Sequence, residues 1–184
     1  MKCVLILFLS LVFSASYGQA DVEYYITLNN DTVICDILPF SPFHKELNVK
    51  RHIKAVKFVL NGKKDYFHPL DIKGYSFVFD GERYNFFSFP YIRKNFFHEI
   101  VSGKIGFYYL YYSNTYDGSM VIHRFIVKGE VYSFVSIFNA KKKLAMFLED
   151  CPGLYQEWQD ENKCYKKLEE YIRKYNEVLN CKNK

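Results

Sequence analysis

Glycine-containing turns divide the first three quarters of this chain into segments too short for ordinary helices. Asn61-Gly62 and Asp80-Gly81 each separate two runs rich in β-branched and aromatic residues, and later breaks contain Gly103, Gly118 and Gly129. Such a dipeptide between apolar runs is a strong short-range sign of a β-hairpin. The sequence therefore predicts seven or more antiparallel strands within residues 22–138, arranged as a β meander, a sandwich or a partly open barrel.

Three hairpins are expected in the first half of this region. The first surrounds Asn29-Asn30-Asp31, and the other two surround the Asn-Gly and Asp-Gly pairs. Their strands are expected at residues 23–28 and 32–38, 55–60 and 64–68, and 74–79 and 83–87. Four further strands are expected at residues 99–101, 104–112, 119–127 and 130–137.

After Asn139 the spacing of apolar residues changes from two to about 3.6, which indicates helices. Pro152 suits the first position of a helix that would end near residue 162, and a last helix is expected over residues 165–180. The chain is thus predicted to be an α+β protein whose helical segment, residues 140–181, docks on the sheet. The expected buried positions are Ala140, Leu144, Phe147, Leu148, Leu168, Ile172, Tyr175 and Leu179.

The N-terminus has the layout of a secretory signal peptide. Lys2 precedes the apolar run Val4–Phe13, and the small residues Ser16 and Gly18 come before the expected cut. That run is shorter than the roughly 20 residues of a membrane-spanning helix, and no later stretch reaches that length. We expect residues 1–18 to be removed and residues 19–184 to form one exported domain without a transmembrane segment. It would be periplasmic, envelope-associated or extracellular.

Composition limits the class of partner. The chain is 49% hydrophobic and 20% aromatic, which favours a folded domain with a substantial core. Loss of Lys2 would leave 24 lysines and arginines against 20 acidic residues, a net charge of about +4. These charges are interspersed apart from Lys141-Lys142-Lys143, which is interpreted as a solvated helix start, so nucleic acid is not expected as a partner.

The cysteines favour disulfide bonds. Removal of Cys3 leaves four, an even number in an exported chain. Cys164 lies at one end of the predicted last helix and Cys181 at the other, about 25 Å apart, and Cys151 and Cys164 similarly bracket the helix before it. The hypothesis is therefore that Cys151 bonds Cys181 and that Cys35 bonds Cys164.

No motif predicts a catalytic, cofactor-binding or metal-binding residue. The five histidines never show the spacing of a zinc-binding helix, and glycines in a phosphate-loop pattern are absent. His98 and Glu99 are adjacent, but neighbours on a strand point to opposite faces, so a shared acid–base site is not expected. No cofactor is predicted.

Aromatic residues are the unusual feature of the composition. Five of the six residues from Phe107 to Tyr112 are aromatic. A strand buried on both faces explains this most simply. The alternative is an exposed platform formed by Phe107, Tyr109 and Tyr111, which would stack on a sugar, a peptide or a membrane-associated partner.

Several short segments carry a resemblance to a known group of proteins. They are residues 25–32 (YITLNNDT), 68–75 (HPLDIKGY), 80–84 (DGERY), 97–105 (FHEIVSGKI) and 150–152 (DCP), all downstream of the signal peptide. The chain resembles the uncharacterised exported proteins of Bacteroidetes bacteria, which implies an envelope location but no activity. The function expected is a non-catalytic binding or structural module of the cell envelope, with an envelope protein or a glycan as partner. A secreted hydrolase with an unrecognised active site is the alternative.

Overall fold

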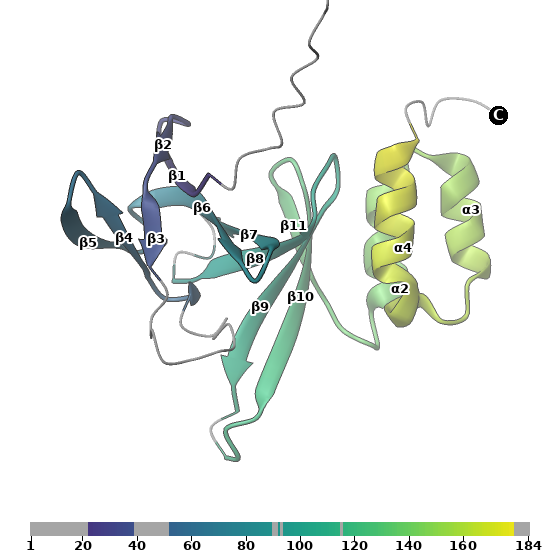
Figure 1. Ribbon diagram of the computed structural model, residues 1–184. Helices are drawn as coiled ribbons and strands as arrows, with labels where there is room; N and C mark the ends of the chain where they lie inside the picture. The colour runs from purple at the N-terminus through teal and green to yellow at the C-terminus, as the bar shows by residue number, and fades with distance from the viewer. Residues whose placement is uncertain (1–21, 39–51, 90–91, 93, 115, 179–184) are drawn as a thin grey trace, which may run out of the picture.

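The computed structural model describes residues 22–38, 52–89, 92, 94–114 and 116–178, and these form antiparallel sheets followed by helices (Figure 1). The α+β prediction is confirmed. The strands are β1 (Tyr24–Thr27), β2 (Thr32–Ile34), β3 (Asp36–Leu38), β4 (Val56–Leu60), β5 (Lys63–Phe67), β6 (Ile72–Phe79), β7 (Glu82–Ser88), β8 (Phe96–Val101), β9 (Gly106–Ser113), β10 (Met120–Lys128) and β11 (Val131–Val135). The helices are α2 (Ala140–Leu148), α3 (Pro152–Asp160) and α4 (Cys164–Glu177). The predicted signal peptide lies outside the described residues.

Both sheets are open. The large sheet has the strand order β11-β10-β9-β8-β7-β6-β1-β2, and the small sheet has the order β3-β4-β5. Strands β6 to β11 follow one another as a meander, as the turn pattern predicted. Asn61 and Asp80 adopt positive φ angles of 51° and 52° ahead of their glycines, which is the backbone of a tight two-residue hairpin turn.

The predicted strand over residues 32–38 is two strands that belong to different sheets. It breaks at Cys35, whose backbone N–H donates to the Glu23 carbonyl at 3.2 Å. The Glu23 carboxylate then accepts the backbone N–H of Ile37. These bonds turn the chain out of the large sheet, so the second predicted hairpin forms the small sheet instead of extending one continuous meander.

The helices and the small sheet cover different halves of the same face of the large sheet, here called the inner face. On one half, Tyr75 and Phe86 of the large sheet pack with Phe58 of the small sheet. On the other half, Phe107 of β9 and Ile126 of β10 pack against the helices. Figure 1 shows the small sheet near one end of the twisted large sheet and the helices near the other. The opposite, outer face has no helix or strand layer among the described residues.

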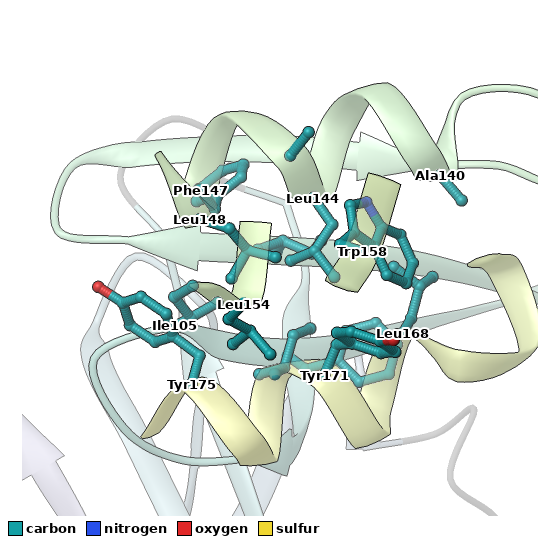
Figure 2. Close-up of a cluster of buried hydrophobic side chains, with 14 of the residues drawn as sticks. Ile105, Ala140, Leu144, Phe147, Leu148, Leu154, Trp158, Leu168, Tyr171 and Tyr175 are labelled. Carbon is teal, nitrogen blue, oxygen red and sulfur yellow. The ribbon is translucent and has the colours of Figure 1, made fainter. Parts of the chain in front are cut away.

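The core of the helical unit forms around Trp158 of α3 (Figure 2). Its ring is fully buried and lies 4.9 Å from the ring of Tyr171 on α4. The indole N–H donates to the Lys141 carbonyl on α2 at 2.8 Å, so the one polar atom of this side chain has a partner. Trp158 therefore joins all three helices.

The sequence pattern predicted these helices well. Pro152 occupies the first turn of α3, and every expected core position within the described residues is buried. Ion pairs of Glu169 with Arg173 and of Glu170 with Lys174, each four residues apart on α4, are present at 2.8 and 3.3 Å. None of the helices in the described part of the chain has both the length and the apolar character needed to cross a membrane.

Candidate binding surface

The aromatic side chains of the predicted platform, Phe107, Tyr109 and Tyr111, belong to the core. Phe107 and Tyr111 are buried, and half-buried Tyr109 packs against the helical cluster. All three project from β9 onto the inner face, where Phe107 and Tyr109 pack in the helical cluster and Tyr111 packs in a separate cluster with Ile53. The prediction of an exposed platform formed by Phe107, Tyr109 and Tyr111 is therefore wrong. The simpler interpretation, core packing, is correct for this side of the strand.

A different set of aromatic residues lies on the outer face, at the end of the sheet formed by β9, β10 and β11. We call it the outer aromatic strip, and it consists of Tyr112, His123, Phe125 and Phe134. Strand pairing places Phe125 directly opposite Phe134. The rings form a continuous row, with centroids 4.7 Å apart for Tyr112 and His123, 5.2 Å for His123 and Phe134, and 5.6 Å for Phe125 and Phe134.

The outer aromatic strip is accessible and carries little charge. Phe134 is 43% exposed and Tyr112 is 38% exposed, while His123 and Phe125 are half-buried beneath them. Side chains alternate along a strand, so Arg124 of β10 points to the inner face, where its guanidinium donates to the Tyr165 carbonyl at 3.0 Å. The strip thus offers ring faces to a partner, without a carboxylate, lysine or arginine of β10 or β11 beside them.

The strip adjoins one edge of the large sheet. β11 is the edge strand there, and it has five residues without a charge or a proline. The opposite edge strand, β2, has three residues and is flanked by Asp31 and Asp36. Short strands and nearby charges protect a sheet edge against pairing with another chain. The β2 edge has both kinds of protection, whereas the β11 edge, next to the strip, is longer and has one adjoining charge, that of Glu130.

The two side chains that most resemble a catalytic acid–base pair, His98 and Tyr111, lie on the inner face of the large sheet. His98 Nδ1 is 2.8 Å from the Tyr111 hydroxyl, and its ring stacks between those of Tyr84 and Phe86 at 5.4 and 5.1 Å. Burial lowers the pKa of His98 to about 4. Glu99 instead contacts Asn85 and Tyr108 on the outer face, which confirms that His98 and Glu99 do not share a site.

A hollow of about 420 Å³ lies at the far end of the outer face from the strip. Ile26, Leu28, Leu70 and Phe87 supply much of its apolar lining. Lys73 is its cation, and the ammonium group donates to the Asn30 side-chain oxygen.

One of the two predicted disulfide bonds is absent. Cys35 and Cys164 are both free and buried, so the bond predicted between them is absent. They lie in separate cores, Cys35 under the small sheet and Cys164 under the helices. Burial raises the pKa of the Cys35 thiol to about 11 and also raises that of Cys164, which leaves both poorly reactive. Cys151 is disulfide-bonded, and its predicted partner Cys181 lies outside the described residues.

Neither metal ligation nor a known relative identifies the site. In the described ranges, no three histidine, cysteine, aspartate or glutamate side chains gather closely enough to hold a metal ion. Comparison with protein-family models, with curated proteins and with solved structures found no match to this chain. The resemblance to exported Bacteroidetes proteins therefore stays a prediction.

Proposed function

We propose that this protein is an exported, non-catalytic binding module of the cell envelope, and that it binds its partner through the outer aromatic strip. The observation that carries this proposal is the row of rings formed by Tyr112, His123 and Phe134, of which Tyr112 and Phe134 are exposed, on a part of the sheet that no described helix or strand covers. Large aromatic side chains lose little conformational entropy on binding and supply much contact area. The low charge of the strip suits a partner with apolar faces, such as an extended protein segment or a glycan.

The neighbouring sheet edge favours a protein segment over a glycan. An extended segment that paired with β11 would continue the antiparallel order of the large sheet. Every second side chain of that segment would then lie on the outer face, next to Phe134 and Phe125. Main-chain hydrogen bonds would supply affinity, and contacts with the strip would determine which side chains the bound segment must carry. A glycan would use the rings alone.

The alternative of a secreted hydrolase has weaker support. His98 and Tyr111 are the nearest approach to a catalytic pair, but stacked rings enclose the histidine. A substrate would have to displace part of this aromatic layer to reach the imidazole. The binding proposal requires no such rearrangement, since Phe134 and Tyr112 already face solvent.

The binding proposal predicts that Phe134→Ser abolishes most partner capture. Loss of one central ring from such a surface should weaken binding at least about tenfold. Mature protein fixed to a resin would be exposed separately to envelope proteins and to envelope glycans, and bound material would be quantified. Tyr116→Ser is the matched control, because Tyr116 is 97% exposed but lies on the turn after β9. Equal capture by the wild type and Phe134→Ser would contradict the proposal.

We also propose that Cys151 forms its disulfide with Cys181, which would close the helical unit. Support comes from the bonded state of Cys151 and from the free thiols of Cys35 and Cys164. Peptide mapping of unreduced mature protein should recover a Cys151–Cys181 peptide and an N-terminus at Gln19. Alkylation of Cys151 without prior reduction, or a link from Cys151 to Cys35 or Cys164, would contradict the pairing.

A further inference from the structure

One end of the helical unit combines a fully exposed phenylalanine with a concentration of lysines. The N-termini of α2 and α4 and the C-terminus of α3 meet there. Phe138, in the link from β11 to α2, is 99% exposed, and its neighbour Ile137 is also exposed. Exposed Lys141, Lys163 and Lys166 line the same hollow of about 490 Å³ as these two apolar residues. We call this region the basic end.

Hydrogen bonds hold Phe138 in its exposed position. The Ser136 carbonyl accepts the backbone N–H groups of Asn139 and Ala140 at 3.3 and 3.0 Å. The Asn139 side chain accepts the Ser136 N–H at 2.7 Å, which closes a compact turn around Phe138. The phenyl ring is therefore presented to solvent by an ordered turn, and its binding to an apolar phase would cost little additional ordering.

The lysines occupy positions that are unfavourable for the helices themselves. A helix N-terminus carries a partial positive charge, which acidic residues or a side-chain cap ordinarily compensate. Neither α2 nor α4 has an acidic residue in its first turn or a side-chain hydrogen bond at its N-cap. Lys141 and Lys166 are instead placed in these first turns. Departures from local sequence rules of this kind are expected where a surface serves a function.

Positive charge at the basic end is only partly neutralised. None of the ion pairs found among the described residues involves Lys141, Lys163 or Lys166. Glu161 lies in the same hollow, where its carboxylate accepts the backbone N–H of Lys163 at 2.7 Å. The C-terminus of α3 adds a partial negative charge, and the Lys141 ammonium donates to the Glu161 carbonyl at 3.5 Å. Three lysines and two helix N-termini still outweigh one carboxylate and one helix C-terminus, which leaves a net attraction for anions.

From this arrangement we propose that the basic end docks onto a membrane surface that carries anionic phospholipid headgroups. The lysines would contact the headgroup phosphates, and Phe138 with Ile137 would enter the boundary with the acyl chains. An exposed aromatic residue beside lysines fits a membrane surface. The ring can enter the apolar acyl-chain region while the ammonium groups stay at the charged headgroups. A free phosphate would satisfy the lysines but leave Phe138 in water. The basic end is distinct from the outer aromatic strip, so membrane docking would leave the partner surface available.

The test measures binding of the full mature protein to vesicles of pure phosphatidylcholine and of phosphatidylcholine with phosphatidylglycerol, by co-sedimentation. Binding should require the anionic lipid and should weaken steeply as salt rises, since lysine–headgroup attraction is screened. The double variant Lys163→Gln/Lys166→Gln should bind about twenty-five-fold more weakly, at about fivefold for each lysine. Phe138→Ala should bind at least about tenfold more weakly.

Matched controls separate the basic end from general charge and hydrophobicity. Lys63→Gln/Lys64→Gln removes the same charge from exposed positions of β5, and Tyr116→Ala removes another exposed ring. Both should bind like the wild type. Equal binding to the two vesicle types, or equal effects of the test and control variants, would overturn the proposal. So would saturable binding of glycerol phosphate without vesicle binding, or a Phe138-dependent dimer in sedimentation equilibrium without vesicle binding.

Discussion

Lowering the pH from 7 to 5 should destabilise the folded protein by about 4 kcal/mol, and His52 and His98 should cause this loss. Burial lowers the pKa of each imidazole from about 6.5 to about 4. Between these values the unfolded chain binds a proton at each histidine and the native protein does not. Stability is therefore fully present above about pH 6.5 and falls as the pH decreases toward 4. Each histidine contributes about 2 kcal/mol between pH 7 and 5.

Urea unfolding at several pH values would measure this dependence directly. His52 is 2% exposed and its ring stacks on Phe77 at 4.7 Å, so His52→Phe can keep the ring packing while it removes the proton site. The free energy of unfolding of His52→Phe should change about half as steeply between pH 7 and 5. A slope equal to that of the wild type would show that burial of His52 does not cause the acid sensitivity.

The local elements of the fold were predictable because each depends on nearby residues. Asn61-Gly62 and Asp80-Gly81 fix their turns through their own backbone preferences, and Pro152 marks the start of α3. The division of residues 32–38 between two sheets was not predictable in this way. It depends on hydrogen bonds from Cys35 and Ile37 to Glu23, which lies on the far side of the first turn. These residues are distant in the sequence, so the spacing of apolar residues cannot predict that contact.

The candidate surface was missed for a related reason. In β9 both sets of alternating residues are aromatic, so the pattern cannot indicate which face the helices cover. The helices cover Phe107, Tyr111 is buried in the cluster that contains Ile53, and Tyr112 is exposed. Phe125 and Phe134 are isolated aromatics in the sequence and become neighbours only through strand pairing. A register inferred from a two-residue turn at Gly129-Glu130, which pairs Lys128 with Val131, would have placed them opposite each other, and this was the available signal.

Gly103→Ala should destabilise the protein by about 3–5 kcal/mol, because Gly103 and Asn176 together dock α4 on the sheet. The Asn176 carboxamide accepts the Ile105 N–H at 2.9 Å and donates to the carbonyls of Ile105 and Ser102 at 2.8 and 3.2 Å. Gly103 has a φ of +141°, and a Cβ at this position would lie 2.5 Å from Asn176 Cγ. The alanine would thus strain the backbone and displace the carboxamide from its three bonds.

A double-mutant cycle separates these two costs. Asn176→Ala alone loses the three hydrogen bonds, and Gly103→Ala in that background should cost much less than in the wild type, because the clashing carboxamide is gone. Gly129→Ala is the control for strain alone, since Gly129 has a φ of +59° with no atom within 4 Å of an added Cβ. Its cost should be about 1 kcal/mol. Additive losses in the cycle, measured by urea unfolding, would show that Gly103 does not act through Asn176.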